Sequence, residues 1–125
     1  MKYFLFLIAL YCSTGIFAQE NKPAEVQFLG VLTLADAYKT GPWTDEAMQT
    51  VGAHFKRLMS FNETGKVVFA GRTQYENDHP DLMGLVVFYA TTLEEAIVFM
   101  NDDPAVKGGI MKAKVHPYQI AVGKQ

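Results

Sequence analysis

The stretch LMGLVVFYATTLEEAIVFM, residues 82–100, decides the fold because it contains a complete transition from strand to helix. Its first half, 82–90, is apolar at nearly every position, which is typical of a strand buried on both faces. Thr92-Leu-Glu-Glu95 follows as a capping box, the reciprocal side-chain and backbone bonding that opens a helix. The helix then presents one apolar stripe formed by Leu93, Ala96, Ile97 and Met100. We predict a strand followed directly by an amphipathic helix that buries this stripe.

The chain before this stretch predicts a strand, a helix and a second strand. Residues 26–34, VQFLGVLTL, form another nearly continuous apolar run that suits a strand buried on both faces. Thr44 can cap a following helix, and Gly65 can end it in a left-handed conformation. The stripe of this helix consists of Met48, Val51, Phe55, Leu58 and Met59. Residues 66–75, KVVFAGRTQY, are expected to form the second strand.

The chain after this stretch supplies a final strand. Residues 111–116 alternate apolar and polar side chains, which is the pattern of a strand with one buried face. The predicted order is therefore β-α-β-β-α-β. This order is that of a ferredoxin-like α+β fold, a four-stranded antiparallel sheet with both helices on one face.

The predicted sheet is too apolar for a monomer. Two helices cover one face, yet the strands at 26–34 and 82–90 are apolar on both faces. An uncovered face would exceed the few hundred Å² of apolar patch that soluble monomers tolerate. We therefore expect a homodimer in which two sheets pack face to face, as in a dimeric α+β barrel.

The N-terminus predicts export. Residues 1–18 have a lysine, a short apolar run and a terminal Ala, which is the layout of a signal peptide cleaved after Ala18. The apolar run is too short for a stable membrane anchor. We expect residues 19–24 to form a short polar leader, residues 25–125 to form one domain, and the mature protein to be periplasmic or secreted. The sole cysteine, Cys12, falls in the signal peptide.

Composition narrows the classes of partner and cofactor. The formal net charge is −2 and no basic run occurs, so a nucleic-acid partner is not expected. Phosphate-binding glycine patterns are absent, and we expect no cofactor. Asp78, His79 and Asp81 share one turn without the spacing of a metal site, so we expect no metal.

Two stretches carry a resemblance to a known family. AHFKRLMSFNETGKVVFAG, residues 53–71, resembles the first helix and second strand of the YciI-like (YCII-related) family. Residues 91–118 resemble the second half of that domain, including an Asp-Pro and a Val-x-Pro near the end. The resemblance implies a YCII-related domain over residues 25–125, a dimeric α+β barrel, and a His-Asp pair in a cleft, which would be His54 and Asp103. Some members of the family act on small, often aromatic, compounds, including a dehydrochlorinase of hydroxylated chloroaromatics, and most have no assigned activity.

The residues themselves leave two interpretations of this pair open. Projected at 100° per residue, His54 lies about 60° from Val51 and borders the apolar stripe, a position that suits a packing histidine or a catalyst. Antiparallel helices would bring Asp103, after the second helix, near His54 on the first. A carboxylate there orients an imidazole that acts as a general base. Asp103 before a proline also suits a turn, and the two roles are compatible.

We therefore expect an exported enzyme that acts on a small organic, often aromatic, molecule by elimination or isomerisation. His54 would be the general acid/base and Asp103 its orienting partner. Arg72 would bind an anionic group, with a surface salt bridge as the other interpretation. Trp43 and Tyr89 would line an apolar pocket, with core packing as the other interpretation. The alternative function is a non-catalytic binding or structural dimeric module in which the His-Asp pair joins two helices.

Overall fold

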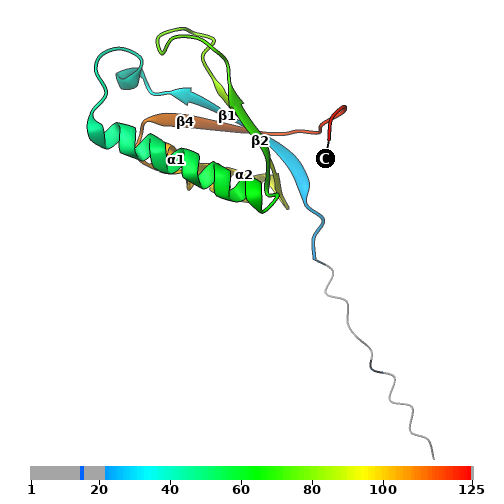
Figure 1. The fold of residues 1–125 in the computed structure, drawn as a ribbon. Coiled ribbons are helices and arrows are strands. Elements are labelled where there is room, and N and C mark those ends of the chain that lie inside the picture. The colour runs from blue at the N-terminus through cyan, green and yellow to red at the C-terminus, as the bar shows by residue number, and fades with distance from the viewer. Residues whose placement is uncertain (1–14, 16–21, 125) are drawn as a thin grey trace, which may run out of the picture.

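The computed structural model describes residues 15 and 22–124, so nearly all of the expected signal peptide (1–18) and part of the polar leader lie outside the described residues. The predicted order of helices and strands is confirmed, with one short helix added after the second long one. In chain order the elements are β1 (Val26–Leu34), a 3-10 helix η1 (Asp36–Tyr38), α1 (Asp45–Glu63), β2 (Val67–Arg72), β3 (Gly84–Ala90), α2 (Leu93–Asn101), α3 (Pro104–Lys107) and β4 (Met111–Pro117) (Figure 1).

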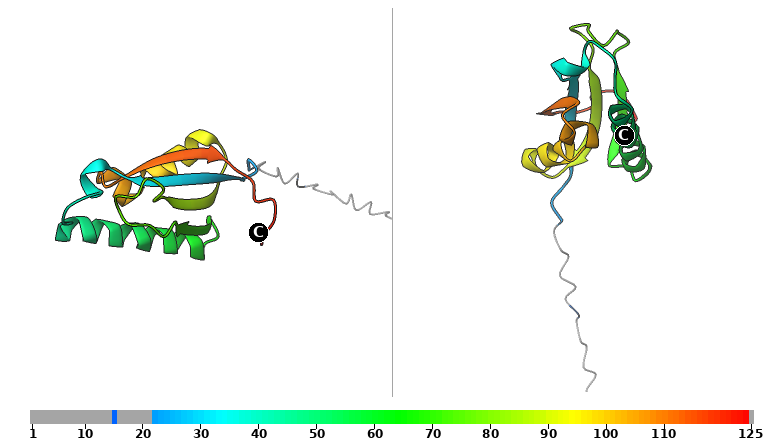
Figure 2. Two further views of the ribbon diagram at one scale, coloured as in Figure 1. Left: turned by 90° about the horizontal axis from the view of Figure 1, so that it is seen from above. Right: turned by 90° about the vertical axis from the view of Figure 1, so that its left-hand side faces the viewer.

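The four strands form one sheet in the order β2-β3-β1-β4, and every neighbouring pair is antiparallel. Figure 2 shows α1 and α2 on the same side of this sheet, with α1 under the β2 edge and α2 under the opposite half. This arrangement is the ferredoxin-like α+β fold predicted from the sequence. No helix in the described part of the chain is both long and apolar enough to cross a membrane.

The core lies between the helices and the sheet. Its buried members are Phe28, Leu32, Leu58, Val67, Val86, Phe88, Ala90, Ala96, Phe99 and Met100. Gly30 of β1 lets Met100 pack directly against the sheet, because a Cβ on Gly30 would lie 2.7 Å from the Met100 Cε. The close approach of α2 to the sheet therefore depends on the missing side chain at position 30.

Side-chain caps begin both long helices. Thr44 accepts a hydrogen bond from the Ala47 amide, and Thr92 accepts one from the Glu95 amide. The reciprocal bond of the predicted capping box is displaced by one residue. Glu95 accepts from the backbone and hydroxyl of Thr91 rather than from the Thr92 backbone. Each helix start is thus fixed by its own sequence.

The predicted apolar stripe of α1 is only partly buried, which corrects the sequence expectation. Leu58 is buried as expected, whereas Met48, Phe55 and Met59 are 53%, 53% and 58% exposed. His54, expected at the border of the stripe, is instead buried. These exposures follow from the position of α1, which lies under the edge strand β2 and beside α3. The two elements together cover only a narrow side of α1.

The predicted buried stripe of α2 and the strand ends also need correction. Leu93 and Ile97 are substantially exposed, because α2 buries the side that carries Ala96, Phe99 and Met100. The segment that follows β2 leaves the ladder before residue 75. There the Thr73 hydroxyl, rather than a backbone partner, receives the hydrogen bond of the Met83 amide.

The sheet face opposite the helices is apolar over β1, β3 and β2, as the strand patterns predicted, whereas β4 contributes Lys112, Lys114 and His116 to it. Cross-strand partners Leu29 and Val87, and Val31 and Leu85, alternate with the core residues of β1 and β3 and so point away from the helices. Phe69 of β2 pairs with Val87 and is 47% exposed. The apolar part of this face, here called the open face, consists of Leu29, Val31, Phe69, Leu85 and Val87, of which Val87 is fully covered by its neighbours.

Gly30→Ala should destabilise the fold by about 1–3 kcal/mol, because the new methyl group overpacks against Met100. Urea unfolding measures the change. In a Met100→Ala background the same substitution should cost nothing measurable, since the clash is gone and Ala orders more easily than Gly. An equal cost in both backgrounds would contradict the close approach.

Candidate active site

His54 and Asp103 form a buried pair, although 49 residues separate them in the chain. His54 projects from α1, and Asp103 lies in the link between α2 and α3. The imidazole Nδ1 lies 2.8 Å from Oδ2 and 2.9 Å from Oδ1 of the carboxylate. The two residues are 3% and 1% exposed. The structure thus brings together the two side chains that the sequence proposed as partners.

Asp103 is held in place as the N-cap of α3. Its Oδ1 accepts a hydrogen bond from the Ala105 amide at 2.9 Å, and Pro104 begins the helix. The preceding acid, Asp102, is the C-cap of α2. The two acids therefore belong to different helix ends, and only Asp102 occupies a position where exposed carbonyls disfavour negative charge. Capping gives the Asp103 carboxylate a fixed orientation toward His54.

Arg57 completes the surroundings of the pair and was not predicted from the sequence. Its Nη2 donates a hydrogen bond of 2.7 Å to the Phe99 carbonyl, and its Nη1 lies 3.6 Å from Asp103 Oδ2. The guanidinium carbon lies 4.4 Å from the Phe99 ring centroid and 5.1 Å from that of Phe61. Its spacing of three residues from His54 on one helix was the available signal.

The electrostatics favour an ionised carboxylate. Burial by itself raises the pKa of Asp103. The hydrogen bond and charge of His54, the Ala105 amide and the Arg57 charge outweigh burial and lower this pKa below its ordinary value. Burial also lowers the pKa of Arg57, against the raising effect of Asp103 and Asp102. The described site therefore holds a carboxylate beside a guanidinium and a hydrogen-bonded imidazole.

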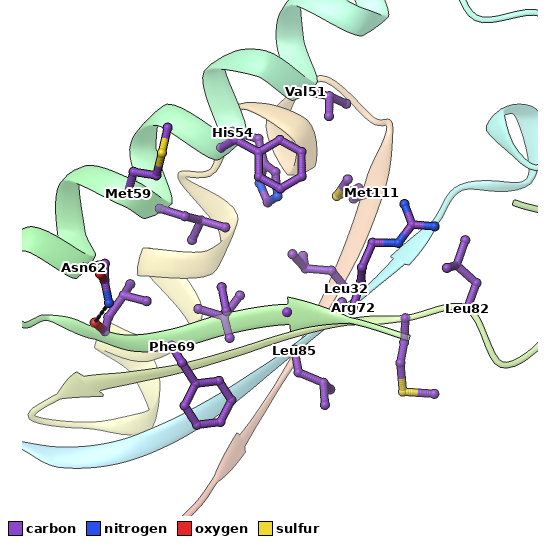
Figure 3. A pocket seen from close by; sticks show the side chains of 18 of the residues that line it. Leu32, Val51, His54, Met59, Asn62, Phe69, Arg72, Leu82, Leu85 and Met111 are labelled. Carbon is purple, nitrogen blue, oxygen red and sulfur yellow. Dashed lines mark hydrogen bonds between the residues drawn. The ribbon is translucent and has the colours of Figure 1, made fainter. Parts of the chain in front are cut away.

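His54 also lines a pocket of about 650 Å³ between α1, the β2 edge and the β2–β3 loop. Figure 3 shows His54 pointing from α1 into this space, with Met59 from the same helix and Arg72 from the end of β2. Most of the lining is apolar, including Leu32, Phe55 and Leu82. Within the described residues, the imidazole Nε2 has no hydrogen-bond partner. The pair thus has one nitrogen engaged with Asp103 and the other available.

The other predicted binding residues divide into two groups. Trp43 and Arg72 both line the pocket. Trp43 donates to the Tyr38 carbonyl, and Arg72 donates to the Tyr75 carbonyl at 3.1 Å. Arg72 forms no salt bridge with any described residue.

Tyr89 does not join the pocket. It lies on the open side of the sheet, where its hydroxyl accepts a hydrogen bond from Gln27 Nε2 at 3.1 Å. The strand alternation that buries Phe88 under the helices directs Tyr89 to the opposite face. Tyr89, which the sequence placed at an apolar pocket, is therefore absent from the lining of the pocket beside His54.

The acidic turn around His79 is built from local contacts. His79 Nδ1 accepts a hydrogen bond from the Asp81 amide, and its ring stacks on Tyr75 with centroids 4.0 Å apart. Across residue 15 and residues 22–124, no three His, Cys, Asp or Glu side chains are grouped so that they could hold a metal ion.

Comparisons with known proteins agree with this fold. A family model described as the YCII-related domain matches residues 20–118. Among solved structures, the chain is similar to 5-chloro-2-hydroxyhydroquinone dehydrochlorinase from Burkholderia phenoliruptrix AC1100, in a complex with 2,5-dihydroxybenzoquinone. The TM-score is 0.55 at 16% identity, covering 75% of this chain and 94% of the dehydrochlorinase. At this identity the likeness shows the fold alone. No curated protein sequence matches the chain.

Asp103→Asn should lower the free energy of unfolding by about 1.5–3 kcal/mol at pH 7, because the imidazole and Arg57 lose an anionic partner. A carboxyl group whose pKa is lower in the folded than in the unfolded protein stabilises the fold at every pH above its unfolded-state pKa. The difference between the two proteins should therefore shrink as the pH falls from about 3.8, the ordinary value, through the lower folded-state pKa. Urea unfolding between pH 7 and pH 3 measures it.

The matched control is Asp102→Asn, an exposed neighbour that should change stability by less than about 0.5 kcal/mol. A difference for Asp103→Asn that stays constant down to pH 3 would contradict the ionised pair.

Proposed function

We propose that this chain, which belongs to the YCII-related domain family, is an enzyme that performs acid–base chemistry on a small organic molecule. The observation that carries the proposal is the buried His54–Asp103 pair in the wall of an apolar pocket. His54 is the general acid/base, and Asp103 orients it. Elimination and isomerisation both suit a single acid–base pair, because each needs one proton removed and no covalent intermediate.

The geometry supports a base that acts through Nε2. Asp103 accepts the hydrogen on Nδ1, so the neutral imidazole carries its lone pair on Nε2, the nitrogen without a partner among the described residues. Nε2 removes a substrate proton, and the electron pair of that bond forms a new double bond. In elimination a leaving anion departs with its bonding electrons. In isomerisation His54 returns the proton to another atom, and Asp103 stabilises the imidazolium in between.

The pocket indicates the class of substrate. Its apolar lining, including Trp43 and Phe55, suits a flat ring. Arg72 offers a cation without a salt-bridge partner among the described residues, which suits a phenolate or carboxylate on that ring. The solved dehydrochlorinase of similar fold acts on a chlorinated hydroxyhydroquinone, so hydroxylated aromatic compounds and quinones are the first candidates.

The near-complete burial of His54 supports the alternative, a non-catalytic module in which the pair joins α1 to α3. The two functions differ in what the free nitrogen does. A structural pair needs only a donor at the Nδ1 position, whereas an enzyme also needs Nε2. A substitution that keeps the first and removes the second separates them.

His54→Asn keeps a donor for Asp103 but has no atom at the Nε2 position. We expect wild-type protein to exchange carbon-bound hydrogen for deuterium, or to release chloride, with a member of a panel of chlorohydroquinones, hydroxyquinones and cyclic diketones. His54→Asn should lower this rate by about 10²–10⁴-fold. Proton NMR in D₂O and chloride assays measure both reactions.

The control is His116→Asn, an exposed histidine on β4 whose loss should leave the rate unchanged. An unaltered rate in His54→Asn would contradict the catalytic role. A wild-type protein that is inactive on the whole panel, together with a destabilised His54→Asn variant, would favour the structural module.

We also propose that the chain forms a homodimer through the open face. On three adjacent strands this face carries four apolar side chains that water reaches, those of Leu29, Val31, Phe69 and Leu85, and water is an unfavourable neighbour for such a patch. The same face of a second copy can cover this patch through a two-fold symmetric interface. Association by this face leaves the helices on the outside of the pair of sheets, whereas Phe69 and Leu85 belong both to the open face and to the lining of the pocket.

Val31→Asp should convert the dimer to a monomer, because it replaces an apolar side chain of the open face with a charge. Its carboxylate would lie beside Lys114, the cross-strand neighbour, which helps the monomer to fold. Val98→Asp, on an exposed position of α2, is the matched control and should stay dimeric. Analytical ultracentrifugation at micromolar concentration measures both. A monomeric wild-type protein would contradict the proposal.

Export is the remaining part of the proposal. Residues 1–18 have the layout of a cleaved signal peptide. Protein recovered from the periplasm or medium of an expressing bacterium should begin at Gln19. Intact-mass spectrometry measures this. Full-length protein retained in the cytoplasm would contradict export.

A further inference from the structure

One buried nitrogen stands out beside the His54–Asp103 pair. Among the buried side-chain nitrogen and oxygen atoms of the described residues, Arg57 Nη1 is the one without a hydrogen-bond partner. It lies 3.6 Å from Asp103 Oδ2, too far for a hydrogen bond but within the range of strong electrostatic attraction. A buried donor left unpaired is costly, so its position calls for a role.

The rest of the guanidinium is fixed by its neighbours. Nη2 donates to the Phe99 carbonyl at 2.7 Å, and the group lies against the rings of Phe61 and Phe99. This anchoring prevents Arg57 from closing on Asp103. Both carboxylate oxygens consequently remain within 2.9 Å of the His54 Nδ1. Arg57 contributes its charge to the pair without taking over the hydrogen bond.

The charged groups around the imidazole come from α1, from the α2–α3 link and from the pocket, which Glu63 of α1 and Arg72 of β2 also line. On its own helix, α1, the neighbouring cation is Arg57, and from the α2–α3 link the facing anion is Asp103. Asp102, also in this link, is exposed and lies 3.5 Å from the ammonium of Lys107 on α3. With neutral His54, Arg57 and Asp103 balance each other. With protonated His54, the buried group carries one uncompensated positive charge, which burial disfavours.

We propose that Arg57 is a positioning residue that keeps His54 in its neutral, proton-accepting form. Arg57 neutralises the Asp103 carboxylate from the side that His54 does not occupy. The imidazole therefore keeps its orienting hydrogen bond without acquiring a permanent proton. This inference rests on the proposed function, because a base is useful only in its unprotonated form.

The test follows the titration of His54 by NMR in the intact folded protein, without substrate. In Arg57→Met and Arg57→Gln the midpoint of the His54 ring signals should move to higher pH by about 1 unit, because a facing positive charge is lost. Gln keeps a donor for the Phe99 carbonyl, so this variant retains the fold if Met does not.

Lys66→Met is the matched control. Lys66 is another cation over the Phe99 ring, at 5.0 Å, but it donates to the Tyr89 carbonyl and lies near Glu95 rather than Asp103. Its loss should leave the His54 midpoint within about 0.3 units of wild type, since no charge that faces the imidazole is changed.

An unchanged or lowered midpoint in Arg57→Gln would overturn the proposal and reduce Arg57 to an anchor for α2. An equal rise in Lys66→Met would overturn it as well, because any cation near Phe99 would then suffice. Since no substrate is used, these outcomes are independent of the His54→Asn turnover test. The proposal about Arg57 and the proposed catalytic role of His54 can therefore be contradicted separately.

Discussion

The hydrogen bond between His54 Nδ1 and the Asp103 carboxylate is the interaction on which the rest of the structure depends. It joins α1 to the start of α3 across 49 residues of chain, in a place where both side chains are nearly free of water. α1 lies under the β2 edge rather than the centre of the sheet, and its other contacts are mainly with β2 and α3. The same bond that fixes this helix also fixes the orientation of an imidazole at a pocket wall.

Much of the fold could be predicted from local sequence signals. Strand runs, the Thr44 and Thr92 caps and Gly65, with φ +83°, define the element order because each acts over a few residues. The extent of burial could not be predicted. Periodicity identifies an apolar side of α1, but the position of the helix under an edge strand decides that Phe55 and Met59 line an open pocket.

The candidate site could likewise be predicted only in part. Antiparallel helices predicted that Asp103 and His54 would meet, and they do. The four-residue helix α3 was missed because Asp-Pro also begins turns, and Arg57 was missed because its role depends on the fold of α2 around it. Tyr89 was expected to line an apolar pocket but does not line the one beside His54, since alternation along a strand does not reveal which side the helices cover. The family match and the likeness to the dehydrochlorinase support the fold, while the proposed chemistry rests on the pair itself.

The central claim is that Asp103 fixes the tautomer of His54 and leaves Nε2 free to accept a proton. Long-range ¹⁵N–¹H correlation spectra of the His54 ring, recorded on the folded protein at a pH where the imidazole is neutral, test it most directly. We predict hydrogen on Nδ1 and an unprotonated Nε2. A neutral ring with hydrogen on Nε2 would contradict it.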